Sequence, residues 1–573
     1  MPSAPCGCIS SSITLTPSRP PTPTSKHLNS LRFFGRQYAW LLLLGAIHAL
    51  SFAPVPLPAW SLPFVQIFSL AFLAYRVFKS GSPGQAALSG FLFGLANFAL
   101  GFYWLYISMH EYGGMAAWLA GTAVVLLAAV EALFIAGAAA FSRWLSGRHL
   151  HATSSYAWQL LIAAVWASSW AFAEWLRGTL FTGFPWLNVG YAHVEGVLAG
   201  WAPLLGVYGL AWFASFASAA IALLACAKDT GNDARAAVGV GCAIIIGLLG
   251  IALGHIAWAR PHGAPIIVRL VQGGVPQSEK FDPQLIQRGL DTYMELARLP
   301  PKEADSAPHL IVLPETVVPL FQDRVAPRLW QQWLDISREQ NARILMGVPL
   351  HDQRQGLDRY TNSAIGFDAQ TPIETLLAGN PDMRYDKHHL VPFGEFVPPG
   401  FRWFVDTMQI PLGDFNRGAV RQALFPIEGQ MISPDICYED VFGEEILQTV
   451  RDSDTHGPGA TILVNISNLG WFGNSWALRQ HLQISRMRAM ETARPMLRAT
   501  NTGMTAAIDP KGVVRAALLP MTPGVLDVEV QGMSGYTPYV RWGNVPVLTW
   551  IGLILLLGFV LRQRATASKS LHV

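Results

Sequence analysis

Long apolar stretches separated by short polar loops occupy the first part of the chain, and a different pattern follows. A membrane-spanning helix needs about 20 mostly apolar residues. Seven such stretches lie in the first part of the chain, and an eighth, Val545 to Leu561, lies near its end. None occurs between Pro261 and about Thr537. The pattern predicts seven membrane helices, one large polar domain and one closing helix. The seven early stretches are approximately residues 38–53, 59–78, 85–109, 115–142, 156–174, 204–226 and 236–259.

These changes of pattern predict four parts. Residues 1–36 are rich in Ser, Thr and Pro and have no apolar core, which is typical of a disordered leader. Residues 37–260 are expected to form the seven-helix membrane domain, residues 261–540 the polar domain, and residues 541–573 the last helix with a basic tail. Because the first apolar stretch lacks a clear cleavage site and six more follow it, we interpret it as a retained helix.

Basic residues in the loops predict the orientation of the helices. Most of them lie in the leader or after the second, fourth, sixth and eighth stretches, and Arg177 is the clear exception. Because basic loops remain in the cytoplasm, we expect both termini there and the polar domain on the other side of the membrane. The residues concerned are Lys26, Arg32, Arg36, Arg76, Lys79, Arg143, Arg148, Lys228, Arg235, Arg562, Arg564 and Lys569.

The outward loop after the fifth stretch has an unusual composition. It reads Glu174-Trp-Leu-Arg-Gly-Thr-Leu-Phe-Thr-Gly-Phe-Pro-Trp186. Its aromatic residues and glycines are typical of an interfacial belt with a re-entrant turn. The alternative is a lipid-facing site in which Arg177 contacts a phosphate headgroup. The sequence leaves both interpretations open.

Within the polar domain, apolar runs alternate with amphipathic stretches, which predicts an α/β layered domain. The expected strands are Pro265–Val271, His309–Leu313, Arg343–Val348, Gln430–Ile436 and Ala460–Ile466. The expected helices include Pro283–Leu299, Ala326–Gln340 and Trp476–Ala493.

Composition supports a membrane protein. Only 13% of the residues are charged and 51% are hydrophobic, whereas a soluble protein usually has about 25% charged residues. The net charge of +3 is too small to indicate a nucleic-acid partner. Few charges lie inside the apolar stretches apart from Glu131 and Glu174, which argues against a transporter. The five cysteines form no metal-ligand pattern, so we expect neither a zinc site nor a disulfide scaffold.

Cys437 is the only cysteine in the polar domain. It follows the apolar run Met431–Ile436 and precedes an expected helix start. A lone thiol cannot form a disulfide within that domain. A nucleophile is commonly presented in this way at the end of a strand, although a small buried core residue is the other interpretation.

Two further segments place reactive side chains after or near apolar runs. Leu310-Ile-Val-Leu-Pro-Glu-Thr316 offers Glu315, and Arg384-Tyr-Asp-Lys-His-His-Leu-Val-Pro-Phe-Gly-Glu395 offers Lys387 and Glu395. A carboxylate can take a thiol proton, and an ammonium can stabilise an oxyanion, so Glu, Lys and Cys together suit acyl transfer. Taken singly, Glu315 could cap a helix and Lys387 could lie in a solvated loop.

The segments LPET, YDKHHLVPFGE and DICYE, in this order, resemble the Glu-Lys-Cys signature of the nitrilase superfamily. With seven helices before the domain and one after it, residues 38 to 562 resemble the membrane-embedded apolipoprotein N-acyltransferase family. The resemblance implies an αββα sandwich and an enzyme without cofactor or metal. It implies that a fatty acyl chain moves from a phospholipid, through a cysteine thioester, to the amino group of a diacylglyceryl-modified apolipoprotein. It also implies a bacterial inner membrane, with the catalytic domain in the periplasm.

The resemblance assigns roles to individual residues. It makes Cys437 the nucleophile, Glu315 the general base and Lys387 the cation that stabilises the oxyanion. It makes Glu395 a support for the lysine. Three further positions match residues that shape the pocket: Asn362, Tyr438 and Glu439.

Two departures from the family pattern affect the expected substrate contacts. Phe281 stands where a tryptophan is common, and Asn468-Leu-Gly-Trp-Phe-Gly473 replaces Asn-Asp-Ala-Trp-Phe-Gly. Phe281 and Trp471 therefore become candidate lipid contacts. Two other functions stay open: a membrane-anchored nitrilase or amidase, and a membrane scaffold with an inactive nitrilase-like domain. We expect a monomer and no nucleic-acid partner.

Overall fold

The computed structural model describes residues 38–52, 57–147, 155–227, 233–301, 307–354, 356–405 and 414–570. The chain divides after Trp40, and Leu41–Val573 forms its second unit. The expected leader, residues 1–36, lies outside the described residues, so its disorder stays a prediction.

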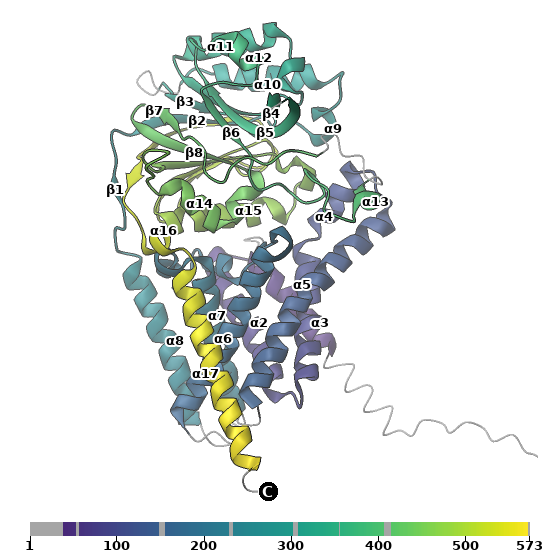
Figure 1. The fold of residues 1–573 in the computed structure, drawn as a ribbon, viewed down its shortest axis with the longest axis vertical. Coiled ribbons are helices and arrows are strands. Elements are labelled where there is room, and N and C mark those ends of the chain that lie inside the picture. Colours follow the sequence, from purple (N-terminus) through teal and green to yellow (C-terminus); the bar gives the residue numbers. More distant parts are fainter. Residues whose placement is uncertain are drawn as a thin grey trace, which may run out of the picture. The chain divides into compact units, whose positions relative to one another are not determined.

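Long apolar helices pack side by side in the first half of the second unit, and the last helix of the chain joins them (Figure 1). Helices α3 and α5 pack together, and α7 contacts α2, α6 and α8. Small residues on several of these faces let the helices approach closely; Gly90 and Gly94 of α3, for example, lie against α5. The helices are α2 (Leu62–Lys79), α3 (Pro83–Gly101), α5 (Ala117–Ser146), α6 (Tyr156–Thr179), α7 (Ala202–Ala227), α8 (Asp233–Leu253) and α17 (Val545–Ser570).

The prediction of eight spanning helices is met only in a coarser form. Among the described residues, four helices are long and apolar enough to cross a membrane, or five if one bent pair counts as a single span. The apolar helices Tyr38–Phe52 and Ala237–Leu253 are shorter. Helix α6 has the length, but its composition is less apolar because it carries Gln159, Ser168, Ser169, Glu174 and Arg177.

The bent pair brings membrane elements up to the polar domain. Helix α3 is followed by α4 (Trp104–Ile107) and a π-helical turn, Ser108–Tyr112, and the two parts are bent by 49°. Figure 1 shows α4 at the level of the polar domain. There the Trp104 ring lies 4.5 Å from the ring of Phe472, centroid to centroid.

The polar domain contains two six-stranded sheets. The first has the order β13-β2-β3-β4-β5-β6 and the second β12-β11-β10-β9-β8-β7. Strands of the first sheet are β2 (Ile266–Gln272), β3 (Leu310–Val312), β4 (Arg343–Arg354), β5 (Leu357–Phe367), β6 (Met383–Asp386) and β13 (Gly524–Val530). Those of the second are β7 (Phe425–Ile427), β8 (Gln430–Ile436), β9 (Ile462–Ser467), β10 (Met496–Thr500), β11 (Ala506–Ile508) and β12 (Val514–Ala517).

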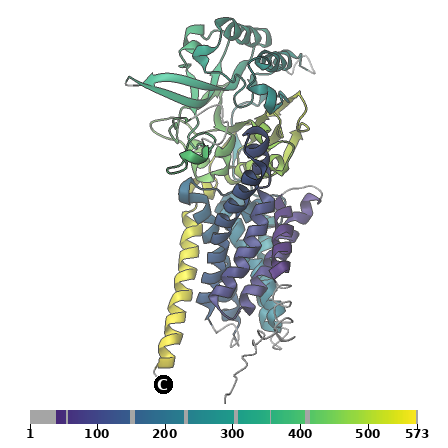
Figure 2. The same cartoon turned by 90° about the vertical axis from the view of Figure 1, so that its right-hand side faces the viewer.

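Helices cover the outer faces of both sheets, which gives four layers (Figure 2). Helices α10 (Ile286–Arg298) and α11 (Pro327–Gln340) bury Leu290 and Trp330 against the first sheet. Helices α14 (Gly443–Val450) and α15 (Trp476–Thr492) cover the second. A separate apolar core fills the space between the sheets. The predicted α/β domain is thus confirmed, with the helix–sheet–sheet–helix arrangement.

The layer of α14 and α15 faces the membrane helices. Trp104 Nε1 donates to Gln480 Oε1 of α15 at 3.0 Å, and the backbone N–H of Val207 in α7 donates to Glu491 Oε1 at 2.8 Å. Helix α16 (Pro538–Trp542) then leads into α17 through Gly543. The helix layer of the polar domain that faces the membrane helices is therefore hydrogen-bonded to them.

Candidate active site

Cys437 occupies a sharp turn at the carboxyl end of β8. It begins the 3₁₀ turn Cys437–Val441 and has a φ of 55°, in the left-handed region that non-glycine residues rarely adopt. Such a conformation costs about 1–3 kcal/mol and persists only where the surroundings hold it. Two side chains hold it here: Asn465 Nδ2 and His481 Nε2 donate to the Cys437 carbonyl oxygen at 3.0 and 3.1 Å.

The His481 tautomer follows from its neighbours. Arg498 can only donate, and its Nη2 lies 2.9 Å from His481 Nδ1, so that nitrogen accepts. The proton is therefore on Nε2, which faces Asp440 Oδ1 at 2.8 Å as well as the Cys437 carbonyl. Burial lowers the pKa of His481, which agrees with a neutral ring. A neutral histidine, held in one tautomer, thus supports the backbone of the Cys437 turn.

Four polar side chains meet on the other sheet. Lys387, the residue after β6, places Nζ 2.9 Å from Glu395 Oε1 and 3.4 Å from Glu315 Oε1. Asn362 on β5 donates from Nδ2 to the same two oxygens, at 2.8 Å to Glu315 and 2.6 Å to Glu395. All four side chains are buried. A lysine and an amide thus hold two carboxylates beside each other.

The second oxygen of Glu315 is also held. Oε2 accepts the backbone N–H of Asn468 at 2.9 Å. The backbone is constrained too, because Thr316 has a φ of 54° and Lys280 Nζ donates to the Glu315 carbonyl at 3.1 Å. The carboxylate is therefore fixed from both the side-chain and the main-chain end.

Glu439 joins the two segments that carry Lys387 and Cys437. Its Oε1 accepts from the Tyr385 hydroxyl and from the backbone N–H groups of His388 and His389, at 2.9, 2.6 and 3.0 Å. Its Oε2 accepts the N–H of Ile436 at 2.7 Å. Burial raises the pKa of Glu439 to about 7, although Lys387 and the backbone donors act in the opposite direction. The buried Glu439 side chain thus connects the end of β6 in the first sheet with the end of β8 in the second.

The charges of Glu315, Lys387 and Cys437 act on one another. Burial and then Glu315 raise the pKa of the Cys437 thiol well above its ordinary value, while Lys387 lowers it. Burial would lower the pKa of Lys387, but Glu395 and Glu315 raise it above the ordinary value instead. The resting site therefore contains a thiol, a permanent ammonium and a carboxylate partner that can accept the thiol proton.

Lys280 is a further buried basic residue close to these groups. Burial lowers its pKa to about 7, although Glu315 partly opposes the shift. Lys280 Nζ donates a hydrogen bond to the Glu315 carbonyl oxygen at 3.1 Å. Sequence reasoning did not select it, yet it directly precedes Phe281, which was selected.

The structure places Phe281 and Trp471 together. Their rings are 5.8 Å apart, and Trp471 also lies 6.2 Å from the ring of Tyr112 in the π-helical turn. These aromatic residues therefore form a contact between the catalytic domain and the bent membrane element. Their role in lipid binding stays a prediction.

Arg177 is not placed to meet a lipid headgroup. Its side chain is fully buried, and Nη2 pairs with Glu174 Oε2 at 2.5 Å while Nη1 lies 3.5 Å from Glu131 Oε2. Nη1 also donates to two carbonyl oxygens of its own loop, those of Phe184 and Trp186, at 2.6 and 2.7 Å. A phosphate would have to displace these internal acceptors, so the structure favours the re-entrant turn.

Sequence reasoning missed three contributors to the site: His481, Asn468 and Lys280. Asn468 stood in a segment singled out for its departure from the family pattern, but its contribution is a backbone N–H, which carries no residue signal. His481 lies in the middle of a predicted helix, so only the packing of that helix against the Cys437 turn reveals its function.

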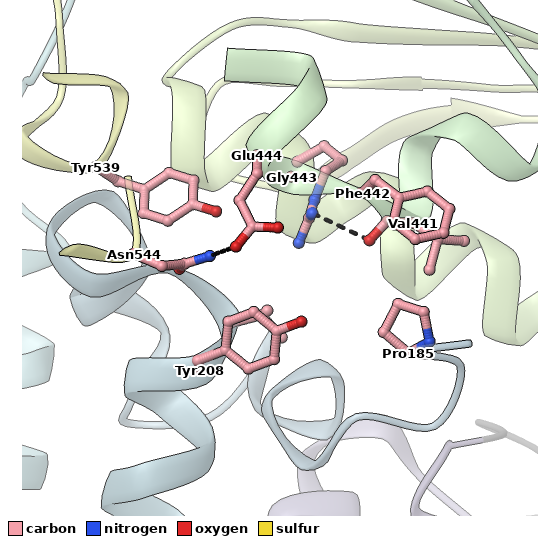
Figure 3. Close-up of a pocket in the computed structure, with 10 residues that line it drawn as sticks. Pro185, Tyr208, Val441, Phe442, Gly443, Glu444, Tyr539 and Asn544 are labelled. Atoms are coloured by element: carbon pink, nitrogen blue, oxygen red, sulfur yellow. Dashed lines mark hydrogen bonds between the residues drawn. The ribbon is translucent and has the colours of Figure 1, made fainter. Parts of the chain in front are cut away.

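A small cavity lies where the catalytic domain meets the membrane helices (Figure 3). Its volume is about 10 Å³, far too small for a fatty acyl chain. Arg488 donates to the Val441 carbonyl at 3.4 Å, and Asn544 Nδ2 donates to Glu444. Neither Glu315, Lys387 nor Cys437 lines it, so it is a packing gap in this seam. The lining residues are Pro185, Val207, Tyr208, Val441, Phe442, Gly443, Glu444, Arg488, Tyr539 and Asn544.

Within the described ranges, no group of three or more His, Cys, Asp or Glu side chains is arranged to hold a metal ion. The groups available for chemistry at this site are the side chains above and the backbone N–H groups around them. The expectation of an enzyme without cofactor stays an expectation.

Comparison with known proteins identifies the family. Residues 44–220 match the family model described as apolipoprotein N-acyltransferase N-terminal domain, and residues 267–539 match the one described as carbon-nitrogen hydrolase. A protein of Bordetella bronchiseptica named apolipoprotein N-acyltransferase is 55% identical over 525 residues, 91% of this chain and 96% of its own. The chain belongs to the apolipoprotein N-acyltransferase family. The resemblance seen in the sequence is thereby confirmed.

Other members of the apolipoprotein N-acyltransferase family agree. A relative of that name in Ralstonia nicotianae is 45% identical over 92% of this chain and 94% of its own.

Among solved structures, an amidase of the nitrilase superfamily from Nesterenkonia aligns with 50% of this chain and 97% of its own, at 16% identity and a TM-score of 0.34.

Proposed function

We propose that the protein transfers a fatty acyl chain from a membrane phospholipid to the α-amino group of a diacylglyceryl-cysteine at the N-terminus of an apolipoprotein. Its membership of the apolipoprotein N-acyltransferase family supports this function. The observation that carries it in the structure is the pairing of Lys387 with Glu315 beside the strained turn of Cys437.

In the first half-reaction, Glu315 accepts the thiol proton of Cys437. The sulfur attacks the ester carbonyl carbon, and Lys387 stabilises the resulting oxyanion. Glu315 then returns the proton to the alcohol oxygen as the carbon–oxygen bond breaks. A lysophospholipid leaves, and the acyl chain remains on Cys437 as a thioester. A base is needed because the raised pKa of Cys437 keeps the thiol protonated near neutral pH.

In the second half-reaction, the amino group of the acceptor attacks the thioester carbonyl. The ammonium form first loses one proton to water, and Glu315 takes another from the nitrogen as the new bond forms. The carbon–sulfur bond breaks, and Glu315 returns this proton to the Cys437 thiolate. The products are an amide and the free thiol, so the site is ready for another cycle.

The membrane helices give this chemistry its substrates. Extracting an acyl chain of about sixteen carbons into water would cost on the order of 12 kcal/mol, at about 0.8 kcal/mol for each CH₂ group. A catalytic domain hydrogen-bonded to membrane helices reacts with the ester near the bilayer and avoids this cost. Soluble nitrilases and amidases have no need of such helices.

The finer features of the membrane arrangement belong to the proposal as well. We propose eight spans, with both termini in the cytoplasm and the catalytic domain in the periplasm of a bacterial inner membrane. The loop charges support this orientation, because basic residues gather on one side of an eight-span count. Nothing in the site requires a second copy, so the proposed working unit is a monomer.

The test is incubation of the purified protein with phospholipid alone, followed by mass spectrometry of the Cys437 peptide. We expect an added acyl group on wild-type protein and none on Cys437→Ala or Glu315→Gln. Addition of a diacylglyceryl-modified peptide with a free N-terminus should then remove the adduct and yield an N-acylated peptide. Equal N-acylation by Cys437→Ala would refute the assignment.

An assay of ammonia release, together with the lifetime of the acyl-enzyme, distinguishes the acyltransferase from an amidase. An amidase with this triad would release ammonia from small amides without lipid, and its thioester would be hydrolysed when no acceptor is present. We expect no ammonia release and an acyl-enzyme that persists until the peptide is added. A scaffold with an inactive domain would show neither reaction.

A further inference from the structure

The loop that follows α6 reaches the nucleophile from the membrane side. The Tyr438 hydroxyl donates to the Gly183 carbonyl oxygen at 3.0 Å, and the Tyr438 ring stacks on that of Trp186 at 6.4 Å and 14°. Tyr438 is the residue directly after Cys437. The loop therefore contacts the turn that presents the thiol.

A second connection runs through α15. Trp186 Nε1 donates to Gln480 Oε1 at 2.8 Å, and the Trp186 ring lies 5.5 Å from the ring of His481. His481 in turn donates to the Cys437 carbonyl at 3.1 Å. Trp186 thus contacts both Tyr438, which follows Cys437 in the chain, and His481, which donates to the Cys437 carbonyl.

Several residues of this loop have an unfavourable backbone conformation. Phe181, Thr182 and Leu187 have φ values of 55°, 74° and 61°, and Gly183 has 81°. A Cβ atom on Gly183 would lie 2.1 Å from the Gly178 carbonyl oxygen. Non-glycine residues in this region are held in place by their surroundings.

Arg177 is the group that holds this loop. Its guanidinium donates to the Phe184 and Trp186 carbonyls, and its charge is balanced by Glu174 and Glu131 within the buried helices. The planar fork of an arginine can reach several acceptors at fixed angles, whereas a lysine acts as a point charge. The carbonyls that it binds lie on either side of Pro185, next to the residues that contact Tyr438.

We infer that Arg177 is a positioning residue for acyl transfer: it holds the Gly183–Trp186 loop against Tyr438 and so fixes the turn that presents the Cys437 thiol. Through this contact, a charge cluster among the membrane helices controls the geometry of a nucleophile in the sandwich. The inference rests on the proposed role of Cys437 as the nucleophile.

The test measures the reactivity of Cys437 in the full-length detergent-solubilised protein, with iodoacetamide and no lipid substrate. Arg177→Lys keeps the positive charge but loses the fork, and we expect alkylation to slow by about ten-fold. Tyr438→Phe removes the hydroxyl and should have a similar effect. Because both act through one contact, the double variant should be no slower than the worse single variant.

Arg143→Lys is the matched control. Arg143 is also a buried arginine on a membrane helix that donates to two backbone carbonyls, those of Ser80 and Gly147, at 2.9 and 2.5 Å. Within the described part of the chain, its hydrogen bonds go neither to the loop nor to Tyr438. Its replacement should leave Cys437 alkylation unchanged, alone and in the Tyr438→Phe background.

Two results would overturn the inference: alkylation of Arg177→Lys at the wild-type rate, or effects of Arg177→Lys and Tyr438→Phe that multiply. If Arg177→Lys does not fold, Trp186→Phe replaces it, since it removes only the N–H that Gln480 accepts and keeps an aromatic ring. A wild-type alkylation rate in Trp186→Phe would then count against the inference. Because no lipid is used, a missing phospholipid adduct would refute the proposed function and leave this result standing.

Discussion

Two buried charge clusters in this protein have the same kinds of charged groups but different roles. In the sandwich, Lys387 lies between Glu315 and Glu395. Among the membrane helices, Arg177 lies between Glu174 and Glu131. Each cluster contains one cation and two carboxylates, and the residues of both are buried.

The difference lies in what the cation does beyond neutralising charge. Lys387 acts on the Cys437 thiol, and its compact ammonium can face an oxyanion that forms there. Arg177 directs its remaining donors to carbonyl oxygens of the protein and shapes a loop. A buried charge cluster thus indicates catalysis only when it interacts with a reactive group; otherwise it builds structure.

Removal of the Lys387 ammonium should have the largest effect. Lys387→Met should reduce acyl-enzyme formation by about 10³-fold or more, because the oxyanion loses the Lys387 ammonium and Glu315 faces Glu395 without this counter-ion. Single-turnover mass spectrometry of Cys437 measures the effect. Arg177→Lys should lose only about ten-fold in the same assay. Equal losses in the two variants would show that the clusters are not different in kind.

The carboxylates offer the second test. Glu315→Gln should slow acyl-enzyme formation by about 10²- to 10⁴-fold, the range expected for a lost general base. Glu174→Gln should slow it by less than about ten-fold, because Arg177 keeps Glu131 and both loop carbonyls. The same single-turnover assay applies, with thermal unfolding as a check on folding. A larger effect for Glu174→Gln would place a reacting group among the membrane helices.

The pH dependence of Cys437 alkylation gives a third test. Because the pKa of the thiol is raised, the reactive thiolate is scarce at pH 7, and alkylation should rise about ten-fold for each pH unit into the alkaline range. Lys387 lowers that pKa, so in Lys387→Met the rise should move to higher pH. Iodoacetamide labelling from pH 6 to 10 measures both curves. A plateau already present at pH 7 would contradict a resting thiol.

The smallest expected effect concerns Lys280 and the pH dependence of folding stability. Unlike Lys387 and Arg177, Lys280 forms no ion pair with a described residue, and burial lowers its pKa to about 7. The unfolded chain binds the proton up to about pH 10, so folding stability should increase as the pH rises from 7 to 10. We expect the thermal midpoint to rise by a few degrees over this range, and less in Lys280→Met. Identical pH profiles would show that Lys280 does not titrate in the folded protein.

Much of the catalytic domain was predictable from local pattern. Strand β8 has the bounds expected for it, Gln430–Ile436, and α15 begins at Trp476 as expected. Buried strands and amphipathic helices have strong hydrophobic signals over several residues. Strands β5, β6, β7, β10, β11, β12 and β13 were not predicted. Of these, β6, β7 and β11 have only three or four residues, which carry too little pattern. The longer strands β5 and β13 were missed as well.

The membrane part shows the limit of the same reasoning. Hydrophobicity located the apolar helices, but it could not distinguish a straight span from the bent pair that ends in the π-helical turn Ser108–Tyr112. Nor could it assign Arg177, since an arginine beside aromatic residues suits a lipid phosphate and a loop carbonyl equally well. Only the positions of the Phe184 and Trp186 carbonyls decided between them.

The sequence by itself determined which residue types are available: one thiol in the polar domain, with a glutamate and a lysine in segments of the right chemistry. It also determined that these groups belong to a protein with long apolar helices. Both are properties of composition and of order along the chain. The tertiary structure alone decided that Glu439 joins the strand ends of two sheets, that His481 supports the Cys437 turn, and that Tyr438 contacts a loop from the membrane helices. These contacts connect residues far apart in sequence through single hydrogen bonds, and a hydrogen bond depends on where two atoms meet in space.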